Sequence, residues 1–300
     1  QTSIEHAFEE CSKQAEKLGL RVTGSEIVGM VPLEAMLEAG RFYLKKQGRS
    51  TGVPEKELVD SAVISLGLAE ISPFDPQKKI IEYAIADNAK LLRKMSISAF
   101  ADELSSESPA PGGGSVAALS GAMSASLSSM VASLTFGRKG FEQVNEIMEE
   151  VACRAQKLKD SFLQAIDDDT NAFNKIAAAQ RMPKDSDEKK KVRDKAMRSA
   201  QQEATLVPLK VLKFSLEAIE LAEIVAEKGN PNTLSDAGVA ALNARAAGDA
   251  ALYNVLINLP GIADAEFVAD VKSRATQMGE LLRQRCQNLH EQVLKQLEGA

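Results

Sequence analysis

This chain of 300 residues has no tryptophan, and aromatic residues make up only 4% of it. Strands of β-sandwiches are enriched in aromatic and β-branched residues, so this scarcity favours a helical bundle built from small residues. Histidine is also rare: His6 and His290 each lie in a polar, helix-like neighbourhood. A Ser-His-Asp triad or a histidine-rich metal site therefore has no well-placed histidine. If the protein is an enzyme, its proton chemistry falls to a carboxylate.

Cysteine and positive charge are scarce as well. Cys11, Cys153 and Cys286 are odd in number, far apart and in no metal-ligand spacing, so we expect free thiols in a reducing cytoplasm and no metal. The net charge of -6 argues against a nucleic-acid-binding surface. No secretory signal is visible. The chain begins at Gln1 within a helical pattern, and we expect it to be an N-terminally truncated part of a longer protein.

Charge is absent altogether from Ser108 to Gly137. Bulky residues recur there at steps of three and four, which predicts a helix, and the other positions are Ala, Ser or Gly. The bulky set is Val116, Leu119, Met123, Leu127, Met130, Val131 and Leu134. Neighbouring helices can approach such a smooth surface closely, so we place it at the centre of a bundle. About 20 apolar residues suffice to cross a bilayer, but the many serines make this segment too polar, and we expect no membrane contact.

A glycine-rich loop precedes this helix, with Pro111 followed by Gly112, Gly113, Gly114 and Ser115. Glycines give the backbone freedom to expose main-chain N–H groups at a helix N-terminus, where ligands can bind. We therefore predict a ligand pocket at the mouth of the central helix. A flexible linker is the alternative explanation of such a run.

The pattern divides the chain into three parts. Residues 1–86 are predicted to be a small, partial α+β segment, with helices after Pro32 and Pro54 and a strand over residues 20–32. Residues 87–94 form a polar linker, and residues 95–300 show only helical patterns, separated by Pro and Gly. The predicted fold is mainly α: a multi-helix bundle around a buried central helix.

One acidic residue breaks the apolar pattern of a long helix predicted over about 141–180. Asp169 follows Ile166 by three residues and precedes Phe173 by four, where the pattern asks for a hydrophobic residue, while Asp168 falls on the polar side and Asp167 lies between. Burial raises the pKa of a carboxylic acid, and an acid that keeps its proton near neutral pH can serve as a general acid. The alternative is a structural acid paired with a buried Arg or capped by Asn.

Further polar residues interrupt apolar segments or flank helix ends. Asn254 and Asn258 lie one turn apart in an apolar run and must each find hydrogen-bond partners. Asn230 and Asp236 belong to a loop and the helix start that follows it. Cations follow the central helix and the acid-bearing helix: Arg138, Lys139, Arg181 and Lys184. Amides, a retained proton and nearby cations suit a heterocycle that carries a carboxylate tail.

The sequence resembles the formiminotransferase-cyclodeaminase family through several motifs in the right order. They are SPAPGGGSVAAL (108–119), TFGRK (135–139), DDDTNAF (167–173), RMPK (181–184), GNPNTLSD (229–236) and NVLINL (254–259). These cover roughly residues 95–270 and resemble the cyclodeaminase domain. GLRVTGSEIVGMVPLEAML and PFDPQKKIIEY, within residues 1–86, resemble the C-terminal end of the formiminotransferase domain.

This resemblance implies an ammonia lyase that converts 5-formiminotetrahydrofolate to 5,10-methenyltetrahydrofolate in histidine degradation, with Asp169 as proton donor. It implies no tightly bound cofactor, a polyglutamylated tetrahydrofolate derivative as substrate, and a helical-bundle homodimer that assembles further in the full-length protein. The residues expected to bind folate are Pro111, Gly112, Gly113, Gly114, Ser115, Arg138, Lys139, Asp167, Arg181, Lys184, Asn230, Asp236, Asn254 and Asn258.

One departure from the family limits the expected activity. The catalytic histidine of the transferase half lies upstream of the residues present here, so we expect no formiminotransferase activity. Two alternatives to the cyclodeaminase remain open: a methenyltetrahydrofolate cyclohydrolase, and a non-catalytic helical assembly module in which Asp169 is a structural acid.

Overall fold

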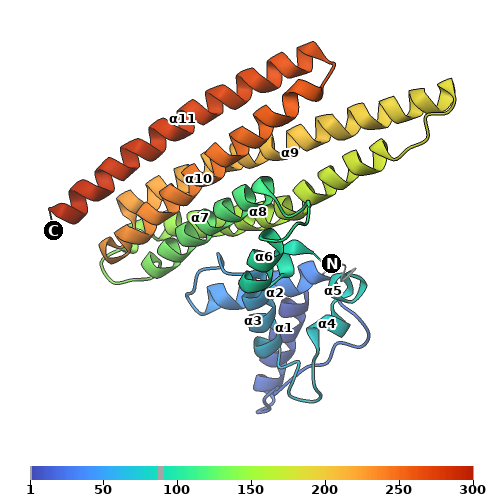
Figure 1. Ribbon diagram of the computed structural model, residues 1–300. Helices are drawn as coiled ribbons and strands as arrows, with labels where there is room; N and C mark the ends of the chain where they lie inside the picture. Colours follow the sequence, from blue (N-terminus) through green and yellow to red (C-terminus); the bar gives the residue numbers. More distant parts are fainter. Residues whose placement is uncertain (1, 87–90, 300) are drawn as a thin grey trace. The chain divides into compact units, whose positions relative to one another are not determined.

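The computed structural model describes residues 2–86 and 91–299 (Figure 1). It divides into two compact units, one formed by residues up to 86 together with Phe136–Cys153, the other by residues 91–135 together with the chain from Arg154 onward. The predicted division differs in that it placed residues 136–153 entirely in the helical domain. Of the predicted linker, residues 87–90 lie outside the described part, and Leu92–Lys94 form the 3-10 helix η1.

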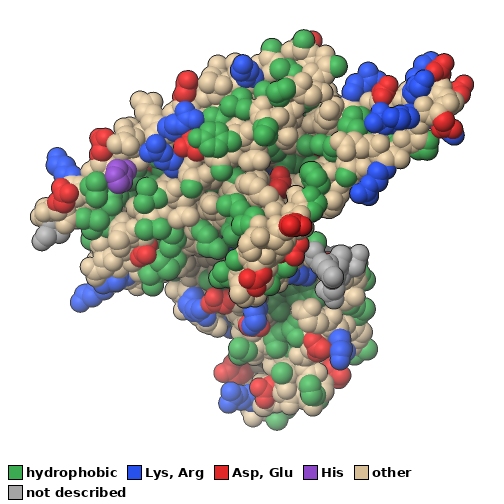
Figure 2. Space-filling view, in the orientation of Figure 1, with side chains coloured by type: hydrophobic (Ala, Val, Ile, Leu, Met, Phe, Trp, Pro, Cys, Tyr) green, Lys and Arg blue, Asp and Glu red, His purple; other side chains and the backbone are tan. Residues whose placement is uncertain are grey.

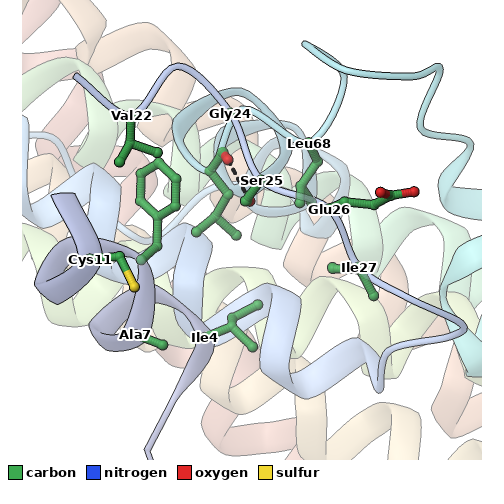
Figure 3. A pocket seen from close by; sticks show the side chains of 11 residues that line it. Ile4, Ala7, Cys11, Val22, Gly24, Ser25, Glu26, Ile27 and Leu68 are labelled. Carbon is green, nitrogen blue, oxygen red and sulfur yellow. Dashed lines mark hydrogen bonds between the residues drawn. The ribbon is translucent and has the colours of Figure 1, made fainter. Parts of the chain in front are cut away.

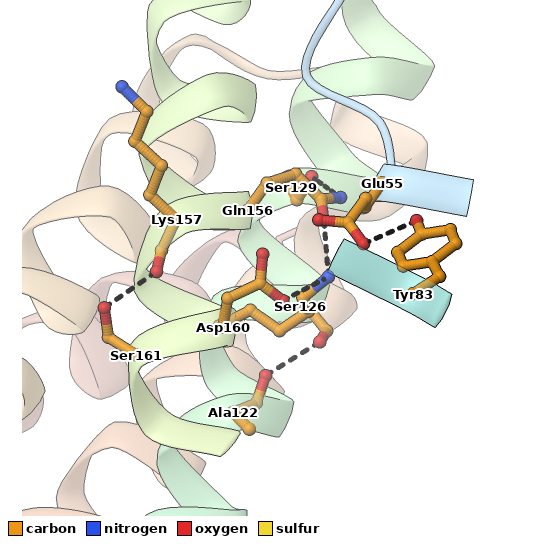
Figure 4. Close-up of polar contacts among 10 residues, drawn as sticks. Glu55, Tyr83, Ala122, Ser126, Ser129, Gln156, Lys157, Asp160 and Ser161 are labelled. Atoms are coloured by element: carbon orange, nitrogen blue, oxygen red, sulfur yellow. Dashed lines mark hydrogen bonds and ion pairs between the residues drawn. The ribbon is translucent and has the colours of Figure 1, made fainter. Parts of the chain in front are cut away.

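The N-terminal unit is a small helical module. Its helices are α1 (Ile4–Lys17), α2 (Leu33–Lys46), α3 (Glu55–Ser65), α4 (Pro76–Lys79), α5 (Ile81–Ile85), η2 (Glu142–Val144) and the first residues of α8 (Asn145–Gln180). The core lies around α2 and α3, where Met36, Leu44 and Ala62 are fully buried. Tyr83 donates a hydrogen bond from its hydroxyl to Glu55 at 2.7 Å (Figure 4).

The strand predicted over residues 20–32 does not form, and the described chain contains no strand. One parallel bridge joins Val31 to Ile80. The segment lacks a neighbouring strand for a hydrogen-bond ladder, so its apolar residues pack another way. Figure 3 shows Val22 and Ile27 lining a pocket of about 340 Å³ together with Ile4 and Cys11 of α1. Val22 and Ile27 therefore face a helix, while Val28 is exposed.

The C-terminal unit is a bundle of long helices. It comprises α6 (Ile97–Leu104), α7 (Gly113–Thr135), the remainder of α8, α9 (Asp187–Lys228), η3 (Pro231–Thr233), α10 (Leu234–Asn258), η4 (Leu259–Gly261) and α11 (Ala265–Glu298). Asp264 caps α11 by accepting a hydrogen bond from the Phe267 N–H at 3.0 Å. Pro208 lies inside α9 without ending it. The mainly α bundle predicted from the sequence is confirmed.

Helix α7 packs against α8, α9 and α10 through its small residues (Figure 1). A Cβ atom at Gly121 would clash with the fully buried Phe162 ring of α8, so only glycine allows this close approach. Ser129 accepts a hydrogen bond from Gln156 of α8 at 2.9 Å (Figure 4). Helix α7 therefore has the predicted central position, and its small residues make the contacts with the neighbouring helices.

The bulky residues of α7 are divided: Val131 is fully buried, while three others point away from the neighbouring helices. Met123, Met130 and Leu134 are 43%, 39% and 52% exposed. By length and composition α7 could cross a membrane, and 61% of its most apolar window is buried inside the structure. The core helix of a globular protein can meet the same criteria.

Candidate active site

A pocket of about 170 Å³ opens where the N-terminal end of α7 meets α8, α9 and the C-terminal end of α10. It is lined by Pro109, Ala110, Gly112, Gly113, Gly114, Asp169, Thr170, Ala172, Phe173, Ile176, Ala204, Asn254 and Asn258. Sites for whole drug-sized ligands typically measure roughly 300–1,000 Å³. The pocket therefore has room for the reacting ring of a larger ligand, with the rest of that ligand outside it.

Asp169 is the only ionisable residue of this lining. It lies on α8 just beyond the buried residues Phe162 and Ile166, so the helical phase that suggested an inward position is correct. The Ser115 hydroxyl donates a hydrogen bond to Asp169 Oδ2 at 3.0 Å. Burial raises the pKa of Asp169, and the hydrogen bonds from the Ser115 hydroxyl and backbone N–H oppose that rise without cancelling it.

The glycine loop allows this carboxyl group to reach the helix terminus. A Cβ atom at Gly114 would clash with the Asp169 carboxylate, so the close approach requires glycine at this position. At Gly113 a Cβ atom would meet only Asn254, at 3.5 Å from Nδ2, which is an ordinary contact. Gly114 thus leaves the space that the Asp169 carboxyl group occupies, while Gly113 faces the open part of the pocket.

Asn254 and Asn258 reach the same pocket from the end of α10. Asn254 Nδ2 donates to the Ala250 carbonyl and Asn258 Nδ2 to the Ala204 carbonyl of α9, each at 2.8 Å. One donor of each amide is thereby fixed on the backbone, which orients the side chain. The carbonyl oxygen of each amide is left to accept a hydrogen bond from a ligand.

Thr170 is a residue of the pocket that sequence reasoning missed. Its Oγ1 atom is buried and has no hydrogen-bond partner among the described residues. A buried hydroxyl without a partner costs free energy, so it points to a bond made when a ligand is present. The helical pattern gave no signal for it, because Thr170 directly follows Asp169 and suits either face of a helix.

Asp167, which we expected to bind folate, does not line this pocket. It is 5% exposed and lies 3.0 Å from the Arg93 guanidinium, and it accepts a hydrogen bond from the Leu92 N–H at 2.8 Å. The carboxylate thus holds η1 against α8. Helical phase predicted that Asp167 lies between the polar and apolar faces of α8, and so underestimated its burial. Arg93, which pairs with it, belongs to η1 and cannot be inferred from the pattern of α8 alone.

Several other predicted residues are not brought to Asp169. The Asn230 N–H donates to Thr135 Oγ1 at 2.9 Å, at the end of α7 that the helical rise places about 33 Å from Gly113. Asp236 lies in the first turn of α10, at the opposite end from Asn258. None of the remaining predicted residues belongs to the pocket lining: Pro111, Arg138, Lys139, Arg181 and Lys184. Pro111 is buried, and Arg181 and Lys184 are exposed at the α8–α9 turn.

The fold and the pocket together define a helical-bundle protein with a candidate acid–base site at the mouth of its central helix. The sequence profile described as Formiminotransferase-cyclodeaminase matches residues 96–277, and that of the Formiminotransferase domain matches residues 1–86. The chain belongs to the formiminotransferase-cyclodeaminase family.

Individual relatives agree with this assignment. The chain is 38% identical to formimidoyltransferase-cyclodeaminase of Dictyostelium discoideum and 34% to that of Rattus norvegicus, over 99% and 92% of its length. It spans about half of those proteins, 54% and 51%. Over 58% of its length it is 43% identical to methenyltetrahydrofolate cyclohydrolase of Methylorubrum extorquens, covering 84% of that protein.

A solved structure extends the likeness to the fold. The crystal structure of formiminotetrahydrofolate cyclodeaminase from Thermotoga maritima superposes with a TM-score of 0.59 at 29% sequence identity. The match covers 69% of this chain and 98% of that one.

Proposed function

We propose that this protein is a formimidoyltetrahydrofolate cyclodeaminase, which converts 5-formiminotetrahydrofolate to 5,10-methenyltetrahydrofolate and ammonia. The observation that carries the proposal is the environment of Asp169. Its carboxyl group has a raised pKa and lines a pocket too small for a whole folate. Such a group suits the protonation of a leaving nitrogen.

The chemistry requires one proton donor at the leaving nitrogen. The N10 lone pair of the substrate attacks the formimino carbon, and the carbon–nitrogen π electrons move to the formimino nitrogen, which takes up the N10 proton. Asp169 then protonates this amino group, the carbon–nitrogen bond breaks, and ammonia leaves as the methenyl carbon–nitrogen double bond forms. The Asp169 carboxylate remains.

The neighbouring groups suit the binding of the pterin ring. The carbonyl oxygens of Asn254 and Asn258 accept hydrogen bonds from ring N–H groups, and the Thr170 hydroxyl supplies a further donor or acceptor beside Asp169. The apolar part of the wall, which includes Phe173 and Ile176, covers the ring.

A methenyltetrahydrofolate cyclohydrolase is the second candidate, and the 43% identity to the enzyme of Methylorubrum extorquens favours it. That likeness covers 58% of the chain. The relatives named formimidoyltransferase-cyclodeaminase extend through residues 1–86, where the transferase-domain profile also matches. A transferase-type segment is expected beside an enzyme that acts on formiminotetrahydrofolate, which favours the cyclodeaminase.

We also propose a homodimer, with substrate carrying a glutamate tail. Helix α7 packs on α10, which also exposes large apolar residues, including Leu242 and Tyr253. Figure 2 shows apolar side chains gathered on the surface of the helical bundle. Such a surface suits an interface between two copies.

The test is an absorbance assay of methenyl product with ammonia quantified in parallel. We expect equimolar ammonia from 5-formiminotetrahydrofolate, and a rate that falls as pH rises through the raised pKa of Asp169, because the carboxylate has no proton to donate. Asp169→Asn should lower kcat by about 10²–10⁴ while the protein still folds and binds folate.

Three results would count against the proposal. Hydrolysis of the methenyl compound without ammonia release from the formimino compound would identify the cyclohydrolase instead. Full turnover by Asp169→Asn would remove Asp169 from the reaction, and loss of folding in that variant would favour a structural acid.

A further inference from the structure

One turn of α8, residues 167–170, is held from two sides by a single stretch of the chain. The Ser115 hydroxyl at the start of α7 donates a hydrogen bond to Asp169 Oδ2 at 3.0 Å. The Leu92 N–H of η1 donates to Asp167 Oδ1 at 2.8 Å. Side chains two positions apart on a helix point in different directions, so these contacts act on different sides of α8. Residues 92–115 therefore contact the turn that carries the candidate acid at both of their ends.

Arg93 completes the contact on the side of η1. Its Nη1 atom lies 3.0 Å from Asp167 Oδ2 and also donates a hydrogen bond to Gln164 Oε1, three residues earlier on α8. Asp167 is buried, and its Oδ2 atom accepts no hydrogen bond from the described residues. Burying a carboxylate is costly unless a cation compensates its charge. Arg93 is therefore the group that allows Asp167 to lie against η1.

The position of this turn matters because Asp169 fits its surroundings closely. The Asp169 carboxyl group occupies the space that a Cβ atom at Gly114 would need, so a small movement of α8 changes where the acid lies relative to α7. A reacting group misplaced by about 1 Å can cost about 10²-fold in rate. A contact that fixes this turn therefore affects the proton transfer without touching the ligand.

We propose that Arg93 is a positioning residue of the candidate active site, which through its ion pair with Asp167 fixes the turn of α8 that presents Asp169 to the substrate. This role rests on the proposed function, since it takes Asp169 as the proton donor. Neither Arg93 nor Asp167 lines the pocket. The ion pair should therefore affect kcat and leave KM and substrate affinity almost unchanged.

Two variants separate positioning from stability. Arg93→Met keeps an apolar side chain of similar length but removes the cation, so it leaves Asp167 buried and unpaired. Arg93→Met/Asp167→Asn removes both charges, and its amide oxygen can still accept the hydrogen bond from the Leu92 N–H. For each protein, kcat and KM are measured by methenyl absorbance, the free energy of unfolding with denaturant, and binding of 5-formyltetrahydrofolate by calorimetry.

Arg154→Met is the matched control. Arg154 also forms an ion pair on α8, with Glu220 at 2.7 Å, and its side chain is 32% exposed against 28% for Arg93. The helical rise places it about 22 Å from Asp169 along α8. Its loss should change stability but keep kcat within about twofold of wild type, because distant sites act independently.

We expect Arg93→Met to lose stability and to lower kcat about tenfold, with KM and 5-formyltetrahydrofolate affinity within about twofold of wild type. The double variant should regain stability, because no buried charge lacks a partner, and should keep the low kcat, because the ion pair no longer fixes the turn. Arg93→Lys retains a cation beside Asp167 and should restore most of the lost turnover.

Three outcomes would overturn the inference and leave the proposed function standing, provided that wild type releases ammonia. They are an unchanged kcat in Arg93→Met, a kcat that recovers together with stability in the double variant, and a double variant that does not fold. In each case the ion pair would serve only the fold. A wild type that releases no ammonia from 5-formiminotetrahydrofolate would overturn the proposed function itself.

Discussion

At the scale of single residues, the candidate site consists of one acid and the groups that control its proton. Burial favours the neutral form of Asp169, while Ser115 at the start of α7 stabilises the charged form. These opposing effects leave the pKa raised but keep the carboxylate a stable product of proton transfer. The helix N-terminus thus helps the acid after it has donated its proton.

Thr170→Val tests whether the unpartnered hydroxyl serves the ligand. Valine has nearly the same shape and similar helix propensity, and it removes a buried hydroxyl that has no partner among the described residues. We expect the free energy of unfolding to stay equal or rise by up to about 1 kcal/mol, because an unsatisfied hydroxyl is costly. We expect kcat/KM to fall about tenfold, measured by methenyl absorbance.

Thr170→Ser is the matched control because it retains the hydroxyl. It should keep kcat/KM within about threefold of wild type. If Thr170→Val loses stability and keeps activity, the hydroxyl has a structural partner and no part in substrate binding.

Some residues of the candidate site can be predicted from a local sequence pattern, and others depend on the packing of separate helices. Asp169, Asn254 and Asn258 stand out because a polar side chain interrupts an apolar helical face, which is a local pattern. Thr170 and Ala204 carry no such contrast, and only the packing of separate helices places them at the pocket. Asn230 and Asp236 resemble site residues by type, but their helix ends lie away from Asp169.

At the scale of elements, α7 combines a packing role and a binding role at different glycines. The structure buries mainly its small residues, together with Val131, so the smooth surface seen in the sequence is the one that neighbouring helices contact. Close helix approach at Gly121 requires that face to be smooth, and Met123, Met130 and Leu134 lie outside it. The periodic pattern identifies the helix and its smooth surface, but the partner of each small residue follows only from the packing of separate helices.

Two substitutions on α7 should separate these roles. Gly121→Ala inserts a methyl group into the Phe162 ring, so we expect a loss of about 1–3 kcal/mol of unfolding free energy from overpacking. Gly113→Val faces the pocket, so we expect little change in thermal stability and clearly weaker folate binding. Thermal unfolding and calorimetry with 5-formyltetrahydrofolate measure the two effects. A Gly113→Val variant with wild-type affinity would refute the contact between this loop and the ligand.

At the scale of the whole molecule, the exposed apolar residues are not evenly spread. In the C-terminal bundle, α7 and α10 pack on each other and expose large apolar side chains. They are Met123, Met130 and Leu134 on α7, and Val239, Leu242 and Tyr253 on α10. Contiguous apolar surface on a protein usually marks an interface. Because α7 carries no charge, its part of this surface offers no charged group to steer a charged partner, which favours a second copy of the same chain.

Met123→Lys tests the proposed homodimer at the middle of α7. In a two-fold interface each substitution occurs on both copies, so two lysines lose water and bring like charges together. We expect wild type to have the mass of a dimer by light scattering after size exclusion, and the variant to shift to a monomer with helical circular dichroism retained. Ile64→Lys on α3, at a residue 78% exposed outside this surface, should remain dimeric. A monomeric wild type, or a Met123→Lys protein that stays dimeric, contradicts this interface, and the apolar stripe would then need another partner.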